Sequence, residues 1–181
     1  LTLFYIIIAI IIINFIKDKI LNALNAKHFN DELPIHINDV YDEKEYKKSQ
    51  EYKKTNYQFG ILTSTFSVVL TLGFLLLDGF EYVDNMARSY SNNDIIIALI
   101  FFGIIMLASD VLTIPFSYYS TFVIEERFGF NKTTLKTFFL DKIKGWFILI
   151  IVGGGIISLI IWFYQLSGDY FWLYAWGLVA L

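Results

Sequence analysis

Residues 94–134 read DIIIALIFFGIIMLASDVLTIPFSYYSTFVIEERFGFNKTT, and this stretch decides the fold. Its first part is apolar over 95–112, which is long enough for a membrane helix, and its last part is a dense block of charged and aromatic residues. One acid, Asp110, lies inside the apolar part. An ionisable side chain at membrane depth is costly unless it faces protein or water, so Asp110 is a candidate functional residue.

The composition places the chain among membrane proteins. Of its 181 residues, 56% are hydrophobic and 17% are charged, whereas soluble domains carry about 25% charged residues. The apolar residues come in blocks, which is typical of membrane spans. A net charge of −3 gives no indication of a nucleic-acid partner. Because the chain has no cysteine, it has neither disulfides nor thiolate metal ligands.

Five apolar blocks predict an all-α, polytopic membrane fold with about five transmembrane helices. The spans are expected near 1–16, 59–77, 95–116, 146–166 and 171–181. The first would be about 24 Å long as a helix, slightly short of a hydrocarbon core of roughly 30 Å. Since the sequence opens and stops inside apolar runs, we expect residues 1–181 to be a fragment of a longer membrane protein.

The basic residues alternate between the connections. Eight lysines lie in 17–58, one arginine lies in the next loop, five basic residues lie in 117–145, and none lies in the fourth loop. Because cytoplasmic loops carry the excess of Lys and Arg, the loops 17–58 and 117–145 are predicted to be cytoplasmic and the amino end to lie outside.

The first two connections have different expected structures. In 17–58 the chain is interrupted at Pro34, and a solvated helix starting at Asp42 leads into the second span. His28 and His36 are eight residues apart, which does not match the spacing of a zinc-binding helical pair, so we expect them to be solvated. Residues 78–94 are expected to form a short, acidic loop.

The third connection carries local helix signals. Gly129 is a candidate C-cap, and Thr133 or Asn131 is a candidate start of the next helix. An apolar face follows, made of Leu135, Phe138, Phe139 and Ile143. We expect a cytoplasmic interfacial helix that turns into the fourth span, where three adjacent glycines, 153–155, permit a kink or the close approach of a neighbour.

A polar stripe runs along the third span. At 100° per residue, Thr113, Ser117 and Thr121 fall at about −60°, −20° and +20° from Asp110, and Glu125 follows close to them. Such a stripe should face either neighbouring helices or an aqueous chamber, and both interpretations stay open here. Pro115 removes one backbone hydrogen bond and is expected to bend the helix.

A second polar face lies on the second span. Thr63, Ser67 and Thr71 recur every fourth residue, with Ser64 beside them. Close helix packing, with the hydroxyls bonded back to their own helix, is favoured over a wall that faces a wet cavity.

The block at 121–134, TFVIEERFGFNKTT, followed by Phe138 and by DKIK at 141–144, resembles the amino-terminal membrane domain of the CAAX prenyl proteases. These are integral-membrane zinc metalloendopeptidases. Further similarity lies in YKKSQEY at 46–52 and in PFS at 115–117. The resemblance runs from about Asn25 to the end of the chain.

The resemblance implies a membrane chamber that admits a peptide or a lipidated carboxyl-terminal substrate, lined here by Asp110, Thr113, Ser117 and Thr121. It also implies a catalytic zinc domain beyond residue 181, whose His-Glu-x-x-His motif does not occur in this sequence. We therefore expect no catalytic or metal-ligating residue in this chain, zinc only in the parent enzyme, and no activity of residues 1–181 alone. The partners implied are the bilayer, the substrate and the catalytic domain, and the residues expected to contact that domain are Glu125, Glu126, Arg127, Phe128, Gly129, Phe130 and Asn131.

Two other functions fit the residues without the resemblance. One is a transporter or channel in which Asp110 is an ion or proton site. The other is a membrane assembly module that associates through the glycines 153–155 and the Ser/Thr face. A His-Glu-x-x-His helix further along the chain would separate the protease from both.

Overall fold

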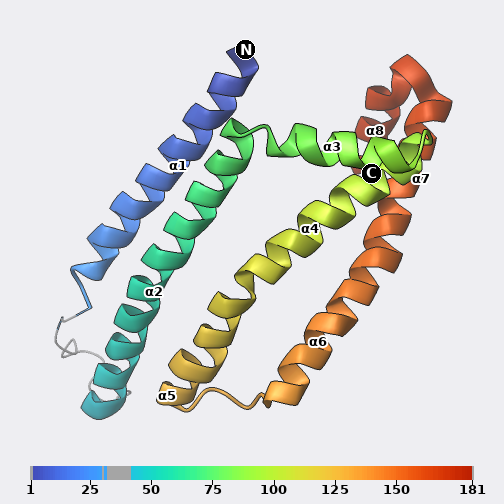
Figure 1. Ribbon diagram of the computed structural model, residues 1–181. Helices are drawn as coiled ribbons and strands as arrows, with labels where there is room; N and C mark the ends of the chain where they lie inside the picture. The colour runs from blue at the N-terminus through green and yellow to red at the C-terminus, as the bar shows by residue number, and fades with distance from the viewer. Residues whose placement is uncertain (1, 30, 32–41, 181) are drawn as a thin grey trace. The chain divides into compact units, whose positions relative to one another are not determined.

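The computed structural model describes residues 2–29, 31 and 42–180, which are helical almost throughout and contain no strand (Figure 1). This confirms the predicted all-α class. Three helical stretches are long and apolar enough to cross a membrane, namely Glu43–Leu76, Asp94–Phe128 and Leu135–Tyr174. The expected break at Pro34 and the residue His36 lie outside the described residues.

The chain divides into two compact units. The first comprises Leu1–Gly79 and Pro115–Lys132, and the second comprises Phe80–Ile114 and Thr133–Leu181. Each unit is built from a long hairpin of helices, and each contains part of the stretch 94–134.

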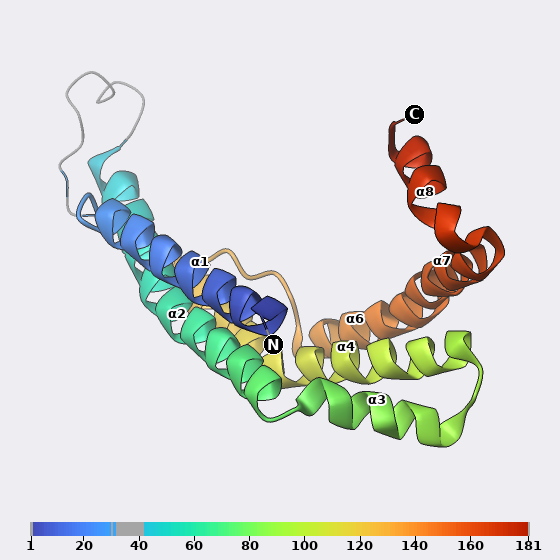
Figure 2. The same cartoon turned by 90° about the horizontal axis from the view of Figure 1, so that it is seen from above.

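In the first unit, α1 (Thr2–Ala26) and α2 (Glu43–Leu76) lie side by side and run in opposite directions (Figures 1 and 2). Both helices extend well into the polar sequence 17–58. The start of α2 is fixed by Asp42, whose side chain accepts a hydrogen bond from the Lys44 backbone N–H at 3.1 Å. The helix predicted to begin at Asp42 is therefore confirmed.

The Ser/Thr face of α2 is bonded largely to its own helix. Thr63 Oγ1 donates to the carbonyl of Gly60 at 3.3 Å, and Thr71 Oγ1 donates to the carbonyl of Ser67 at 2.8 Å. Such back-bonding satisfies the hydroxyls at low cost in an apolar segment. The back-bonding of Thr63 and Thr71 agrees with the packing interpretation, whereas Ser64 and Ser67 line an open groove between α1 and α2.

In the second unit, α3 (Gly79–Tyr90) replaces the loop expected at 78–94, so that expectation was wrong. Its apolar residues Val83 and Ala87 are buried, and Asp84 pairs with Arg88 at 2.7 Å one turn apart. Apolar positions at helical spacing and an i,i+4 ion pair favour a helix over a loop. The acidic composition of the segment concealed this periodicity.

The other long element of this unit is continuous. Helix α6 (Leu135–Ile148) runs through a π-helix, η3 (Leu149–Gly153), into α7 (Gly154–Ser167), and a 3₁₀ turn, η4 (Gly168–Tyr170), leads to α8 (Phe171–Ala180). The expected interfacial helix and the fourth span thus follow each other without a break. Gly154 meets α4, because a Cβ there would lie 3.4 Å from Leu99 Cδ2. This agrees with the close approach expected at the three glycines.

Helix α4 (Asp94–Tyr119) contains Pro115 in its interior and continues as the π-helix η2 (Ser120–Glu125) and the short α5 (Glu126–Phe128). Gly129 ends this run with φ 79°, which confirms the predicted C-cap. The next helix begins later than predicted, with an N-cap one residue after Thr133 and three residues after Asn131. Its N-cap is Thr134, whose hydroxyl accepts the Thr137 N–H at 3.2 Å.

Few apolar side chains of the described residues are buried. They are Val83, Ala87, Ile97, Ile124 and Phe128. The long helices instead expose their isoleucines, leucines and aromatic rings, and Ile151, for example, is 70% exposed. This distribution suits helices surrounded by lipid, where an exposed apolar side chain carries no penalty.

Candidate functional site

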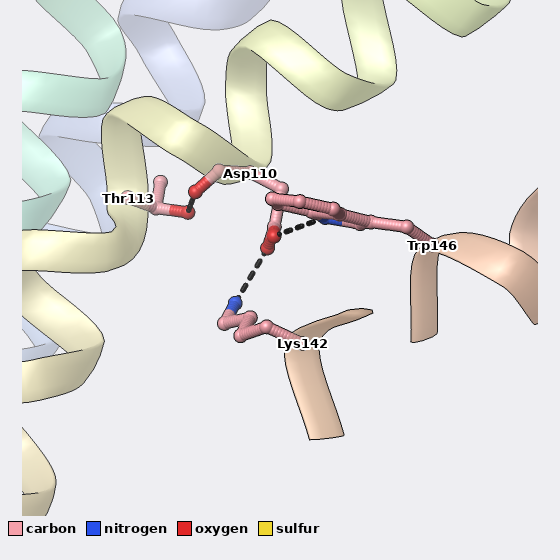
Figure 3. Close-up of polar contacts among 4 residues, drawn as sticks. All are labelled: Asp110, Thr113, Lys142 and Trp146. Carbon is pink, nitrogen blue, oxygen red and sulfur yellow. Dashed lines mark hydrogen bonds and ion pairs between the residues drawn. The ribbon is translucent and has the colours of Figure 1, made fainter. Parts of the chain in front are cut away.

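The carboxylate of Asp110 is bound by two donors from α6 (Figure 3). Lys142 Nζ lies 2.6 Å from Oδ1, and Trp146 Nε1 donates to Oδ2 at 2.8 Å. Both donors are on one face of α6, because they are four residues apart. Each oxygen of the acid therefore has its own partner, and one partner carries the opposite charge.

This pairing explains how an acid is accommodated in an apolar helix. The side chains of Asp110 and Lys142 are 32% and 23% exposed, so both are largely withdrawn from solvent. An isolated carboxylate in such surroundings is strongly disfavoured, whereas a paired and hydrogen-bonded one is tolerated. The contact also fixes which faces of α4 and α6 meet.

Asp110 and Lys142 line an open groove between these two helices. Its volume is about 640 Å³, and Trp146, Thr113 and Asp141 contribute to the polar part of its wall. The remaining lining is largely apolar, including Ile105, Met106 and Leu149. A mostly apolar groove with a few convergent polar groups is the usual form of a small-molecule or peptide site.

The predicted polar stripe is distributed over both units. Asp110 and Thr113 belong to the second unit, whereas Ser117 and Thr121 belong to the first. Thr113 Oγ1 donates to the backbone carbonyl of Asp110 at 2.9 Å, so it supports the helix rather than the carboxylate. All four side chains are half-buried, in contrast to the neighbouring exposed Val111 and Leu112.

The π-helix η2 changes the geometry calculated for the end of the stripe. Thr121 and Glu125 lie within it, and a π turn takes in more residues than an α turn. Angles of 100° per residue therefore do not apply beyond Ser120. Helix π-turns occur often at functional sites.

Glu125 has a partner on α2. Tyr52 Oη donates to Glu125 Oε1 at 2.6 Å, and this hydrogen bond raises the pKa of Tyr52 above its ordinary value. The ring of Tyr52 also contacts Phe128 and Phe130, with centroid distances of 5.2 and 5.0 Å in edge-to-face geometry. Through these contacts Tyr52 holds the charged and aromatic residues 125–130 against α2.

The rest of this block is held by short-range contacts. The backbone carbonyl of Glu125 accepts the N–H of Phe130 at 2.8 Å and that of Asn131 at 3.2 Å, closing the turn at Gly129. The Asn131 amide donates to Glu126 at 2.8 Å. Arg127 is 61% exposed and lies 3.9 Å from Glu51. The block is therefore ordered from within, and Glu126, Arg127 and Phe130 keep exposed surface.

The sequence analysis did not identify the hydrogen-bond partners of the two acids, which are Lys142 and Trp146 for Asp110 and Tyr52 for Glu125. Of these three, Lys142 could have been predicted from the sequence, because a lysine just before an apolar run is a natural partner for an acid in another span.

The described residues do not fit a zinc site. They contain no group of three or more His, Cys, Asp and Glu side chains close enough to hold a metal ion. His28 pairs with Asp31 at 2.7 Å instead, and both side chains are more than half exposed. Structural and catalytic zinc sites need three or four such ligands, so no catalytic step through zinc can be built on these residues.

The fold and this site define a multi-pass helical membrane domain in which charged side chains are paired between helices. A family model described as "CAAX prenyl protease N-terminal, five membrane helices" matches residues 22–181. The chain therefore belongs to the CAAX prenyl protease family, as its amino-terminal membrane domain.

Similar proteins agree with this placement. The chain is 34% identical over 173 residues to a CAAX prenyl protease 1 homolog of Dictyostelium discoideum, covering 93% of this chain and 39% of that protein. It is 34% identical over 161 residues to a probable CAAX prenyl protease 1 of Schizosaccharomyces pombe, covering 80% and 33%. A crystal structure of S. mikatae Ste24p matches with a TM-score of 0.88 at 30% identity, covering 94% of this chain and 42% of that one. The chain thus spans about two fifths or less of the length of these relatives.

Proposed function

We propose that this chain is the membrane-embedded, non-catalytic portion of a zinc metalloendopeptidase, and that it forms the helical chamber that admits a peptide or a lipidated carboxyl-terminal substrate. Membership of the CAAX prenyl protease family supports this proposal, and so does the name shared by its relatives. The zinc ligands and the catalytic residues would come from another part of the complete protein.

The single observation that carries the chamber role is the groove beside Asp110. It combines an apolar wall, suited to a hydrophobic side chain or an isoprenyl group, with an ion pair that fixes polar groups at one place in that wall. A peptide backbone entering an apolar surrounding needs such polar partners, because each unpaired amide is costly. Thr113 and the Asp110–Lys142 pair would supply them.

We further propose that the block 125–131 contacts the catalytic unit. The exposed side chains of Glu126, Arg127 and Phe130 combine both charges with an aromatic ring. Protein–protein interfaces commonly place charged residues at the rim and aromatic residues at the centre. The fixed turn at Gly129 would present them without a loss of loop entropy on contact.

The proposed topology places the amino end outside and the loops 17–58 and 117–145 in the cytoplasm, following the distribution of lysine and arginine. Labelling of lysines from one side of sealed vesicles tests it. Lys47 and Lys132 should react from the same side, and reaction from opposite sides would contradict the topology.

Photocrosslinking tests the chamber. A benzophenone amino acid at position 113 in the complete, membrane-embedded protein should capture a farnesylated CAAX peptide, and an excess of unlabelled peptide should abolish capture. The same group at position 112 is the matched control, because Leu112 lies about 160° away around the helix from Asp110. Equal capture at 112 and 113, or none at 113 in an enzyme that cleaves the peptide, would contradict the proposal.

A further inference from the structure

A second groove lies in the first unit, between α1 and α2, and nothing in the proposed function uses it. We call it the α1–α2 groove. Its volume is about 960 Å³, and its walls come from the facing sides of the two antiparallel helices, which lie side by side in both views (Figures 1 and 2). It is larger than the groove beside Asp110, and all its lining residues belong to one unit.

The polarity of the α1–α2 groove changes along its length. At one end its lining is mainly apolar, with Ile11, Phe15 and Val68 from both helices and with Asn14 and Ser67 among them. At the other end polar groups predominate, with Asn22, Asn25, Asn56 and Lys53 beside the aromatic rings of Phe29, Tyr52 and Tyr57. Because α1 and α2 run in opposite directions, both walls pass from apolar to polar in the same sense. An occupant must therefore itself be apolar at one end and polar at the other.

Lys19 marks the boundary between the two ends. Its Nζ donates to Ser64 Oγ at 2.5 Å and to the carbonyl of Ile61 at 3.2 Å, so the side chain reaches across from α1 to α2. The ammonium group also lies 5.0 Å from the centroid of the Phe15 ring, and of its three N–H donors the two bonds leave one for a ligand. The ammonium group is held at a fixed place in the groove by contacts that do not neutralise it.

The charged residues that line the groove are two lysines, Lys19 and Lys53, and one acid, Asp18, so the net charge of its lining is positive. Asp18 forms an ion pair at 3.5 Å with Lys17, which does not line the groove. Amide side chains add further hydrogen-bond donors at the same end. An ammonium group can bind a phosphate oxygen through a charge-assisted hydrogen bond, and Lys19 is placed to do so, while Lys53 adds positive charge further along the polar end.

We propose that the α1–α2 groove binds an anionic membrane phospholipid, with an acyl chain between the apolar parts of the two helices, the phosphate at Lys19, and Lys53 further along the polar end of the groove. The apolar ends of both walls lie on segments expected to cross the bilayer, 1–16 and 59–77, so the groove opens where phospholipids are present. A phospholipid matches the order of apolar and cationic groups along the groove. The proposal is independent of the peptidase activity.

Native mass spectrometry of the complete purified protein tests it, with phosphatidylglycerol and phosphatidylcholine of identical acyl chains as probes. The double variant Lys19→Met, Lys53→Met should bind phosphatidylglycerol about thirtyfold more weakly, because each lysine near an anionic lipid contributes roughly fivefold. Its affinity for phosphatidylcholine should change much less. Lys44→Met is the matched control, since it removes one lysine of α2 outside the groove and should leave both affinities unchanged.

A groove-filling variant, Ser67→Phe, keeps the test independent of charge. It should lower the binding of both lipids, while size exclusion and helix content show that the protein remains folded. Equal binding of the two lipids by the wild type, or equal effects of the double variant and Lys44→Met, would overturn the proposal. The proposal would also be overturned if the double variant and Ser67→Phe lost affinity for a farnesylated peptide while their lipid binding stayed unchanged. Absence of any retained lipid, together with a crosslink from Asn22→Cys to another part of the complete chain, would show that protein covers the groove.

Discussion

Asp110 and Glu125 lie on one continuous helical run but have different partners. Asp110, inside an apolar helix, is bound by a lysine and an indole on α6, whereas Glu125, beyond the apolar part, is bound by the neutral hydroxyl of Tyr52 on α2. An acid at membrane depth needs a counter-charge, while one near water needs only a neutral donor. We interpret the difference in partner as a consequence of the different surroundings of the two acids, and it predicts unequal consequences when each partner is removed.

The largest effect is expected from Lys142→Met. It leaves the Asp110 carboxylate without its counter-charge and should lower the free energy of unfolding by about 2 to 3 kcal/mol, which is below the roughly 3 to 5 kcal/mol of a fully buried pair because both groups are partly exposed. Thermal unfolding of the detergent-purified protein measures it. The double variant Asp110→Asn, Lys142→Met should recover most of the loss, and a double variant as unstable as the single one would show that the charge pair is not the cause.

Trp146→Phe should have the next largest effect. It keeps the aromatic ring but removes the indole N–H that donates to Asp110, at a cost of about 1.5 kcal/mol for a hydrogen bond to a charged group. Trp162→Phe, at an exposed position of α7, is the matched control. The same thermal measurement should give a lower midpoint for Trp146→Phe than for Trp162→Phe. Equal midpoints would show that the indole hydrogen bond to Asp110 does not stabilise the protein.

Tyr52→Phe should cost about 1 kcal/mol, because it removes only the hydroxyl and retains the contacts with Phe128 and Phe130. The raised pKa of Tyr52 adds a pH dependence. The protonated phenol is stabilised in the folded state, so its contribution is complete below the ordinary tyrosine pKa of about 10 and is lost as pH rises through the folded pKa. The stability difference between wild type and variant should therefore be constant from pH 7 to 9 and shrink above pH 10.

Tyr46→Phe serves as the control for this series, since it removes a hydroxyl from the same helix two turns earlier. It should leave stability nearly unchanged across the pH range. A Tyr52→Phe difference that grows above pH 10 would contradict the proposed donor role of the hydroxyl.

The smallest effect is expected from Gly129→Ala. The positive φ of 79° at this C-cap disfavours any residue with a Cβ, so the substitution should destabilise the protein by about 0.5 to 1 kcal/mol although space is available. Gly103→Ala, in the interior of α4 and also with open space, should instead be neutral or slightly stabilising. Equal shifts in the thermal midpoint would show that the backbone conformation at Gly129 is not the cause.

The sequence was informative where a single residue carries the physical signal. Asp110 is recognisable because an acid in an apolar run is rare, and Gly129 because only glycine readily adopts the left-handed conformation that ends a helix. Asp42 likewise identifies the start of α2 as an N-cap. In each case the reason is local and can be read without knowing the fold.

The partners could not be predicted in the same way. Lys142 and Tyr52 lie 32 and 73 residues from the acids they bind, and several lysines and tyrosines were equally eligible before packing selected one. The π-helix η2 has no clear sequence signal, so the angles calculated for Thr121 and Glu125 were based on the wrong helix type. Helix α3 was not predicted because the four acidic residues of the segment 78–94 resemble a loop, although the apolar residues Val83 and Ala87 have helical spacing.

Water access along the stripe is the most direct test of the chamber. The chain has no native cysteine, so single cysteines at positions 113, 117 and 121 of the complete protein in sealed vesicles report individually on a membrane-impermeant thiol reagent. We expect labelling at these positions, protection by a substrate peptide, and no labelling of Leu112→Cys on the opposite face of the helix. Protection of all three stripe positions from the reagent in the absence of substrate would contradict it.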